Sequence, residues 1–290
     1  ESGKAIAVGP SGEVVVTGIF EGTADFGGPM LTSAGQTDIF VAKYSSAGQH
    51  LWSKSFGDRG SLDSGNGVAV DGNSNVLVAG SFAGSVNFGG GWLTGAGSTV
   101  FVAKYSSSGG HLWSQSFGGS SSDAAKSIAV DGSGYLTLTG AFEGSIDLGG
   151  GPLISMGATD VFVAQYSSAG THRWSRRYGG SSGDDTGNAV AVDDSGNLVV
   201  TGSFIGTVDF GGAPLVGASS TEIFVAKYTP AGAHLWSHRF GARSTQEANA
   251  VAVSDSRVFV SGIMARSVDF GGGLLGSAGG TDVFLLCPEP

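Results

Sequence analysis

Five side chains that can ligate a cation or accept hydrogen bonds recur at one position of the sequence, each shortly before a glycine pair. They are Asp25, Asn87, Asp147, Asp209 and Asp269. Asp and Asn in glycine-rich turns commonly accept backbone N–H groups of the same turn. The alternative is oxygen ligation of Ca²⁺, which takes about six to eight oxygens. We favour the turn and keep Asp25, Asp147, Asp209 and Asp269 as Ca²⁺ candidates.

A second series of carboxylates would have to help complete such a cation site. Asp38, Asp160, Glu222 and Asp282 each precede a β-branched and aromatic run, although Thr99 takes this position in one copy. The spacing is not that of an EF-hand calcium loop. We therefore predict no cofactor and leave Ca²⁺ as the one cation to test.

Four histidines hold a single repeat position, and each stands two residues before a tryptophan. The pairs are His50 with Trp52, His111 with Trp113, His172 with Trp174, and His234 with Trp236. Equivalent residues of separate repeats lie far apart, so these histidines cannot converge on one metal ion. We interpret them as polar residues at the start of a strand and the tryptophans as packing residues. A repeated ligand pocket made by both is the alternative.

Catalytic machinery is not recognisable in the sequence. The glycine pairs lack the following Lys-Ser/Thr of a phosphate-binding loop. A nucleophilic serine needs a histidine base and an orienting acid, and no repeat departs from the others in a way that would provide them. We predict no catalytic residues and a chain that is not an enzyme, with a propeller-type lyase or hydrolase as the least favoured alternative.

Trp92 is the best single candidate for contact with a ligand. It follows Gly89, Gly90 and Gly91, where other repeats carry Met30, Pro152, Pro214 or Leu274. An aromatic face beside Asp or Asn hydrogen-bonding groups suits a carbohydrate. The structural interpretation, in which Trp92 caps a gap between blades, is still the one that we favour.

The motifs belong to repeats that cover the whole chain. The Asp-Phe-Gly-Gly motif returns at intervals of 60 to 62 residues, and Phe-Val-Ala-Lys-Tyr and His-Leu-Trp-Ser follow it with the same period. Such periods indicate repeat architectures. We predict one domain, 1–290, with repeats of approximately 1–62, 63–122, 123–184, 185–245 and 246–290.

Each repeat reads as four short strands without a helix. In the fourth repeat the predicted strands are 189–192, 198–204, 223–228 and 234–240, separated by turn-forming residues. The first strand alternates Ala with Val, which suits crowding around an axis, and the later strands carry Phe, Tyr and Trp. Strands repeated in this way predict an all-β, five-bladed propeller. Lys43, Lys104 and Lys227 are expected to cover apolar surface with their stems while their ammonium groups reach water.

The repeats resemble the bacterial SBBP β-propeller repeat family and, more loosely, NHL-like propeller repeats. The resemblance lies in the Ala-Val-Asp-x-Ser-Gly-Asn turn, the Val-Thr-Gly-x-Phe strand, the Phe-Val-Ala-Lys-Tyr strand and the Trp-Ser-x-x-Phe-Gly ending. It implies a bacterial protein that is secreted or exposed at the cell surface. It implies no activity, because propellers serve many functions.

The fifth repeat departs from the pattern. The first three strands occur five times, but the tryptophan-bearing fourth strand occurs four times, and the last repeat ends at residues 287–290. Either a segment before Glu1 supplies the missing strand or the last blade keeps three strands. An open edge invites pairing with another strand. Cys287, the single cysteine, is expected to be a free thiol.

Composition narrows the range of partners. The net charge is −10 and the pI about 4.7, which disfavours nucleic acid. No apolar run approaches the ~20 residues of a membrane-spanning helix. We predict a non-catalytic interaction module, secreted or surface-exposed, that binds glycans or a surface protein in a multivalent, lectin-like manner. The main alternative is an architectural spacer or docking domain of a larger surface protein.

Overall fold

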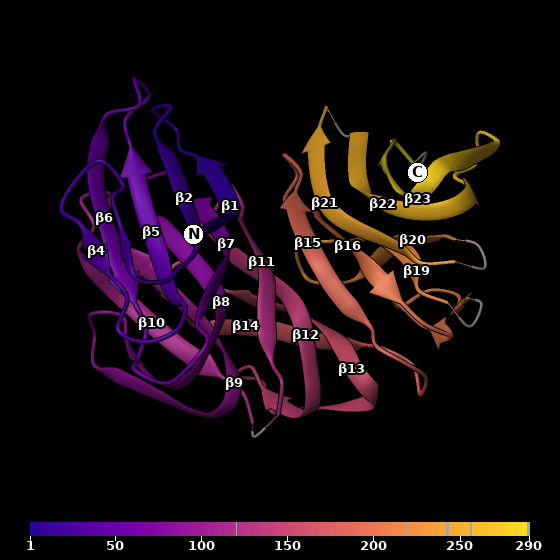
Figure 1. The fold of residues 1–290 in the computed structure, drawn as a ribbon. Coiled ribbons are helices and arrows are strands. Elements are labelled where there is room, and N and C mark those ends of the chain that lie inside the picture. The colour runs from indigo at the N-terminus through magenta and orange to yellow at the C-terminus, as the bar shows by residue number, and fades with distance from the viewer. Residues whose placement is uncertain (120, 218–219, 242–243, 256, 289–290) are drawn as a thin grey trace.

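The computed structural model describes residues 1–119, 121–217, 220–241, 244–255 and 257–288, and these residues form strands and turns but no helix. Five antiparallel sheets follow one another along the chain (Figure 1), and we call them blades one to five. Blade one holds β1 (Ser2–Val8), β2 (Val14–Phe20), β5 (Asp38–Tyr44) and β6 (His50–Phe56). Blade two holds β7 (Ser64–Val70), β8 (Val76–Asn87), β9 (Trp92–Tyr105) and β10 (His111–Phe117).

The remaining blades repeat this order. Blade three holds β11 (Ala124–Val130), β12 (Leu136–Asp147), β13 (Pro152–Tyr166) and β14 (His172–Tyr178). Blade four holds β15 (Thr186–Val192), β16 (Leu198–Phe204), β19 (Glu222–Tyr228) and β20 (His234–Phe240). Blade five holds β21 (Gln246–Ser254), β22 (Arg257–Asp269) and β23 (Leu274–Leu286). The prediction of an all-β, five-bladed propeller whose last blade lacks the outer strand is confirmed.

The connection between the second and third strands of each blade is a hairpin arm that carries the Asp-Phe-Gly-Gly turn. In blades two, three and five the arm continues the long strands themselves. In blades one and four it is a separate ribbon, formed by β3 (Thr23–Ala24) with β4 (Leu31–Thr32) and by β17 (Thr207–Val208) with β18 (Leu215–Val216). Each blade thus carries one Asp-Phe-Gly-Gly turn at the end of its hairpin arm, and the five turns are equivalent in position.

Large aromatic side chains fill the spaces between blades, as predicted. Between blades one and two, Val15, Ile39 and Val41 form a buried cluster with Phe82, Phe88, Phe101 and Tyr105. Ring pairs such as Phe88 and Phe101, whose centroids are 4.5 Å apart, add stacking contacts. Burial of each large side chain contributes about 1.5–3 kcal/mol. Packing of one blade on the next therefore supplies the core.

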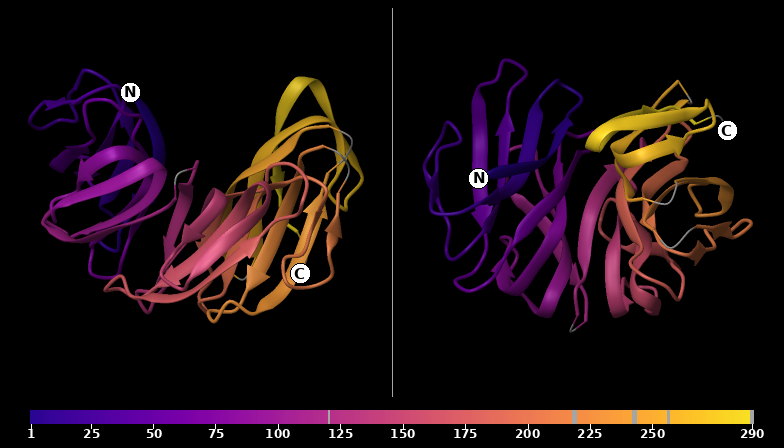
Figure 2. Two further views of the ribbon diagram at one scale, coloured as in Figure 1. Left: turned by 90° about the horizontal axis from the view of Figure 1, so that it is seen from below. Right: turned by 45° about the vertical axis from the view of Figure 1, so that its right-hand side comes forward.

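The five blades form an arc with two free ends (Figure 2). The inner strands pack against one another in the order β1, β7, β11, β15 and β21. At the N-terminal end, 68% of Ile6 on β1 is exposed, whereas its counterparts Val68 and Val190 are 7% and 6% exposed. Both views of Figure 2 place the first and last blades at opposite ends of the arc.

The recurring lysines do not reach water as expected. Lys43 and Lys104 are buried, and each forms an ion pair with a carboxylate of the first turn in its own blade: Lys43 Nζ lies 3.5 Å from Glu13 and Lys104 Nζ 2.8 Å from Asp71. Each also donates to a carbonyl of the next blade, Lys43 to Ser74 and Lys104 to Ser168. The following blade packs over the ammonium group and excludes water from it. This contact between two blades cannot be predicted from the sequence of one repeat.

Candidate functional site

The five Asp-Phe-Gly-Gly turns are closed by the side chain of their own first residue. Asp25 Oδ1 accepts the N–H of Gly27 at 2.8 Å, and Asn87 Oδ1 accepts the N–H of Gly89 at the same distance. Asp147, Asp209 and Asp269 do the same in the other blades. Glycine is needed because Gly27 has a φ of 91°, a left-handed conformation that other residues rarely adopt.

These turns lie in five different blades, so the candidate Ca²⁺ ligands do not converge. Nor do the carboxylates of the second series join them. Asp160 pairs with Arg177, and Glu222 lies 2.5 Å from Arg239. Asp38 and Asp282 each accept a backbone N–H of their own hairpin arm. Among the described residues no group of three or more acidic, histidine or cysteine side chains could hold a metal ion.

Each recurring histidine lies directly beneath the glycine turn of its own blade. His50 occupies the space beside Gly27 and Gly28, and its ring meets Tyr44 edge-on with centroids 6.0 Å apart. Its Nε2 lies 3.1 Å from Ser53 Oγ. The same arrangement recurs for His111, His172 and His234. We call this space the histidine slot, and its contents are packing groups of the blade.

The tyrosine of the histidine slot completes the support of the turn. Tyr44 donates its hydroxyl to the carbonyl of Phe26 at 2.9 Å, and Tyr105 donates to Phe88 at 3.0 Å. Burial lowers the pKa of His111, and the nearby Lys54 lowers it further. Both effects favour the neutral form of the His111 ring, which suits a packing role.

The recurring tryptophans connect successive blades through their indole N–H groups. Trp52 donates to the carbonyl of Ser107 at 3.1 Å, and Trp113 donates to Ser168 at 3.2 Å. Trp174 donates to Pro230 in the same way. In each case the acceptor lies in the turn between the third and fourth strands of the following blade. A fourth strand thus contributes to its own blade with its histidine and to the next blade with its tryptophan.

Trp92 differs from the other tryptophans because 68% of it is exposed. It begins β9 and pairs across the hairpin arm with Asn87. Its counterparts at the tips of the other arms are also exposed and differ from blade to blade: Met30, Pro152, Pro214 and Leu274. We call these five positions the tips. The exposure of Trp92 does not fit the favoured sequence interpretation of a cap on a gap between blades, and the residue lies opposite Asn87 on the arm.

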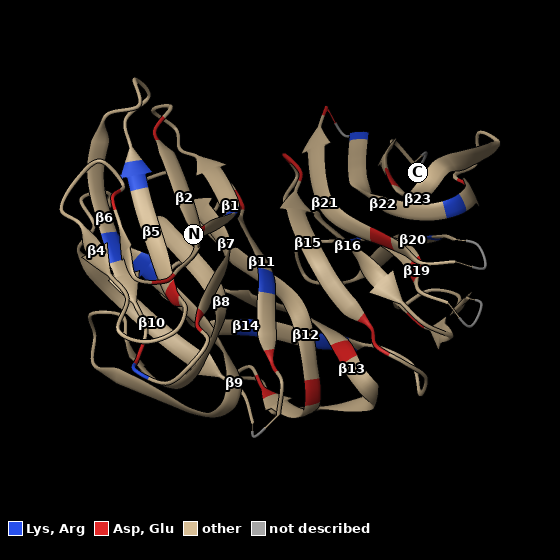
Figure 3. Cartoon of the chain, viewed as in Figure 1, with Lys and Arg blue, Asp and Glu red and all other residues tan. Residues whose placement is uncertain are grey.

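A small pocket lies where the inner strands meet. It has a volume of about 270 Å³ and is lined by residues of all five inner strands, among them Lys4, Asn66, Lys126 and Asn188. Asn66 and Asn188 donate their side-chain amides to the carbonyls of Ala125 and Ala248 on the next inner strand. Acidic and basic side chains elsewhere are spread over all the blades rather than gathered on one (Figure 3). This pocket between the inner strands is thus bordered by side-chain hydrogen bonds that connect one inner strand to the next.

A third set of residues was not recognised from the sequence as a group. Asp63, Asp123 and Asp185 are fully buried just before the inner strands of blades two, three and four. Their Oδ1 atoms accept the N–H groups of Ala83 and Glu143 on the second strand and of Ile205 directly after it. Asp185 therefore connects the segment that enters blade four to the sheet of that blade.

The buried carboxylates of this third set have unusual acidities. Burial raises the pKa of Asp63 and of Asp185 to about 6, although the backbone N–H groups that they accept oppose the shift. Burial also raises the pKa of Asp123. The recurrence of an acid one residue before each of these inner strands was the available signal in the sequence.

Comparison with known proteins supports the repeat architecture. The model of the SBBP family, described as a beta-propeller repeat, matches residues 51–81 and 173–203. The regulatory protein FlaEY of Caulobacter vibrioides is 30% identical over 184 residues, which are 61% of this chain and 19% of that protein. An uncharacterized WD repeat-containing protein, L264, of Acanthamoeba polyphaga mimivirus is 27% identical over 225 residues, 64% of this chain and 16% of that protein. The chain thus spans about a fifth or less of these relatives.

One comparison with solved structures corrects a prediction. XC5397 of Xanthomonas campestris, described as a gluconolactonase, matches 99% of both chains with 12% identity and a TM-score of 0.28. The expectation that this chain is not an enzyme is contradicted by this match to an enzyme, and we withdraw it. The low TM-score and identity give no argument for a particular reaction. The described residues include no helix that is long and apolar enough to cross a membrane.

Proposed function

We propose that this β-propeller repeat protein is an interaction module that uses the tips of its hairpin arms to bind glycans or a surface protein. The observation that carries the proposal is the contrast between the tips and their supports. The turns repeat the same Asp or Asn hydrogen bond in every blade, whereas the exposed tip residue changes from Met30 to Trp92, Pro152, Pro214 and Leu274. Variable exposed residues on a constant scaffold are typical of recognition surfaces.

Trp92 is the principal contact in this proposal. Its indole face is exposed, and Asn87 lies opposite it on the same arm. Asn87 uses its carbonyl oxygen in the turn, while its amide nitrogen donates no hydrogen bond to any of the described residues. An aromatic face beside a free amide donor suits a sugar ring, which presents C–H groups on one face and hydroxyl groups at its edge.

Five tips on one molecule also favour multivalent binding. Linked weak sites gain avidity because binding at one site raises the effective ligand concentration at the next. A repetitive ligand, such as a polysaccharide or a surface coat, would engage several tips at once. We place such a module in a secreted or surface-exposed bacterial setting, which the resemblance of the repeats to the SBBP family supports.

An architectural role is the second candidate. The closely similar supports and the free ends of the arc favour a spacer or docking domain within a larger surface protein. In that case the tips would be tolerated surface residues without a ligand. The two proposals differ in whether the intact chain binds anything through Trp92.

A glycan array probed with the intact chain and two variants tests the proposal. Trp92→Ala removes the exposed indole, and Leu235→Ala is the matched control because Leu235 is an exposed apolar residue on β20, away from the tips. We expect glycan signals that Trp92→Ala reduces at least about tenfold, equivalent to ~1.4 kcal/mol, and that Leu235→Ala preserves. Signals that survive Trp92→Ala would refute the role of Trp92, and an array without signal would favour the architectural role.

A further inference from the structure

Blade three departs from its neighbours at three positions that lie together. Tyr135 ends its first turn, where blades two and four have asparagine; Gln165 replaces a lysine on its third strand; and Arg173 replaces a leucine on its fourth strand. The replaced residues of the other blades are Asn75 and Asn197, then Lys43, Lys104 and Lys227, then Leu51, Leu112 and Leu235. Arg173 donates to Gln165 Oε1, and its guanidinium carbon lies 3.7 Å from the centroid of the Tyr135 ring. Departures from a repeated pattern are expected where a protein carries a function.

These departures remove two hydrogen-bond donors from the carboxylate of the first turn. In blade two, Asp71 Oδ2 accepts the side-chain amide of Asn75 at 3.0 Å and pairs with Lys104 Nζ at 2.8 Å. The carboxylate at this position in blade four has the same two kinds of partner at the same distances. In blade three, Asp131 Oδ1 keeps the backbone hydrogen bonds of the turn, whereas Oδ2 accepts no hydrogen bond from the described residues. The chain thus shows twice that an ammonium group complements this oxygen, and blade three supplies none.

Asp131 borders a pocket between the turns of blades three and four. The pocket has a volume of about 330 Å³, and its lining includes Asp131, Tyr135, Arg173, Asp194 and Pro230. A Cβ on Gly196 of blade four would lie 4.0 Å from Asp131 Oδ2, so this oxygen is directed across the boundary between the two blades. The volume is at the lower end of the range of roughly 300–1,000 Å³ in which proteins hold small molecules.

Arg173 brings the opposite charge to the same pocket. Its side chain is exposed and forms no ion pair with a described carboxylate. Gln165 accepts one of its N–H groups, and the ring of Tyr135 lies against one face of the guanidinium. The other N–H groups face no acceptor among the described residues. A planar guanidinium that is held in this way can bind a carboxylate through two parallel hydrogen bonds.

The two charges together select the kind of ligand. A simple cation in this pocket would be repelled by Arg173, and a simple anion would be repelled by Asp131 and Asp194. A small molecule that carries both an ammonium and a carboxylate group can place each of them beside its opposite charge. The α-amino acids are the most compact class with this pair of groups.

We propose that the pocket between the turns of blades three and four binds a free α-amino acid. The ammonium group of the ligand takes the place beside Asp131 Oδ2 that Lys104 and Lys227 take in their own blades. The carboxylate of the ligand accepts the exposed N–H groups of Arg173. This site is separate from the tips and includes no residue of a hairpin arm.

Isothermal titration of the full chain with each of the standard L-amino acids tests the proposal. Asp131→Asn keeps an oxygen to close the turn and directs an amide donor at the incoming ammonium group. Arg173→Leu introduces the residue that the other blades carry at this position. Asp184→Asn is the matched control, because it makes the same exchange at an exposed residue outside the pocket and keeps an acceptor for Thr159.

A double variant, Gln165→Lys with Arg173→Leu, rebuilds the arrangement of blades two and four inside blade three. The new lysine can pair with Asp131, as Lys104 pairs with Asp71. The variant should therefore lose the ligand while its melting temperature stays equal to that of the unmodified chain or rises. A structural role of the pocket alone would not produce this combination.

We expect saturable 1:1 binding of at least one amino acid to the unmodified chain and to Asp184→Asn. Binding to Asp131→Asn and to Arg173→Leu should be at least about tenfold weaker. The amine and the acid that each lack one of the two charged groups of that amino acid should be weakened to a similar extent. Equal melting temperatures of Asp131→Asn and Asp184→Asn exclude a folding defect.

Three results would overturn the proposal. The first is that no amino acid binds to the unmodified chain. The second is binding that Asp131→Asn and the double variant leave unchanged, because the ligand would then occupy another part of the molecule. The third is equal binding of the amine without its carboxylate, which would indicate a site for cations. None of these results involves Trp92, so failure here is distinguishable from failure of the proposed function.

Discussion

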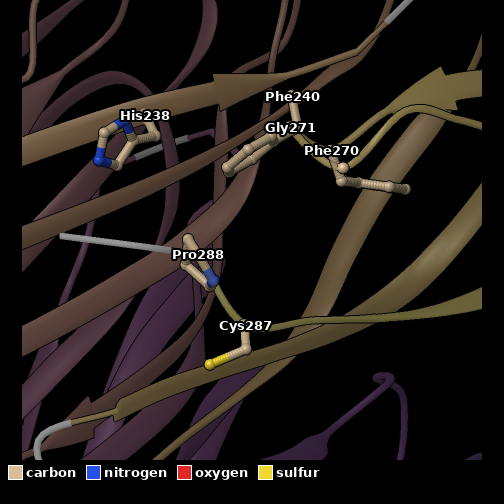
Figure 4. Close-up of a pocket in the computed structure, with 7 residues that line it drawn as sticks. His238, Phe240, Phe270, Gly271, Cys287 and Pro288 are labelled. Atoms are coloured by element: carbon tan, nitrogen blue, oxygen red, sulfur yellow. The ribbon is translucent and has the colours of Figure 1, made fainter.

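The imidazole of His50 lies so close to Gly28 that a Cβ on this glycine would stand 2.2 Å from the ring carbon Cε1. This contact explains why the Asp-Phe-Gly-Gly turn and the histidine of the fourth strand occur in the same repeats. The turn brings the backbone against the ring, and glycine is the one residue without a side chain to obstruct it. In the fifth blade no described residue occupies this place, the histidine slot, and Gly271 and Gly272 border an open pocket of about 390 Å³ (Figure 4).

Replacement of Lys104 by Met should strongly destabilise the fold. Burial alone would raise the pKa of Asp71, but Lys104 and the groups of Asn75 and Asn73 together lower it. Removal of Lys104 leaves this buried carboxylate without its cation, which costs about 3–5 kcal/mol. Urea denaturation should show the loss for Lys104→Met, whereas Lys4→Met, which changes an exposed lysine, should stay within about 0.5 kcal/mol. A small effect of Lys104→Met would mean that the ion pair is exposed in solution.

The stability of the fold should be greatest in mildly acidic solution. Asp63 and Asp185 have folded pKa values raised to about 6 from an ordinary value of 3.8, so the folded state binds protons more tightly between these values. The free energy of unfolding should therefore decrease as the pH rises from about 4 to 6 and change little above. As the pH falls below about 4, the free energy of unfolding should decrease as well. The reason is that four carboxyl groups have lowered pKa values in the folded state and must be protonated there: Glu13, Asp58, Asp71 and Asp193.

Denaturation measured from pH 3 to pH 8 checks this profile. Asp185→Gln is a suitable control, since Gln246 occupies the equivalent buried position in blade five. The variant should have a shallower decrease between pH 4 and 6, whatever its absolute stability. An increase of stability across that interval in the unmodified chain would show that these carboxyl groups are ionised at little cost in the folded state.

Two residues of one hairpin arm should differ strongly in how much the free energy of unfolding depends on their side chains. Phe88 is 1% exposed and stacks on Phe101, so Phe88→Ala should cost about 3–5 kcal/mol. Trp92 is exposed, so Trp92→Ala should change the free energy of unfolding by less than about 0.5 kcal/mol. Thermal and urea denaturation of both variants gives the comparison. A large loss of stability in Trp92→Ala would identify Trp92 as a structural residue and remove it as the principal contact.

The sequence predicts the blades because their determinants are local and repeated. The alternation of Ala and Val in the inner strands, the turn residues and the aromatic third strand all lie within one repeat, and they predict the observed sheets. The three-stranded last blade also follows directly, since the fourth-strand motif occurs four times. These features depend on the pattern of one segment rather than on its neighbours.

Features that depend on two blades were not predictable in the same way. Lys104 is buried because blade three covers its ammonium group, and Asp185 is buried because the chain folds back onto β16. The open histidine slot depends on Pro288, Phe240 and Gly272, which come from two blades. Trp92 could be singled out from the sequence because an exposed tip needs no knowledge of the neighbouring blade.

The equivalence of the five glycine turns, four closed by histidine and one open, is tested most directly by the free energies of unfolding of Gly212→Ala and Gly272→Ala. Gly212→Ala forces a Cβ to within 2.5 Å of His234 and should cost about 1–3 kcal/mol. Gly272→Ala should be neutral within about 0.5 kcal/mol, because its Cβ enters open space. Equal destabilisation by both variants would contradict the open slot in blade five, and a neutral Gly212→Ala would contradict the closed slots in the other blades.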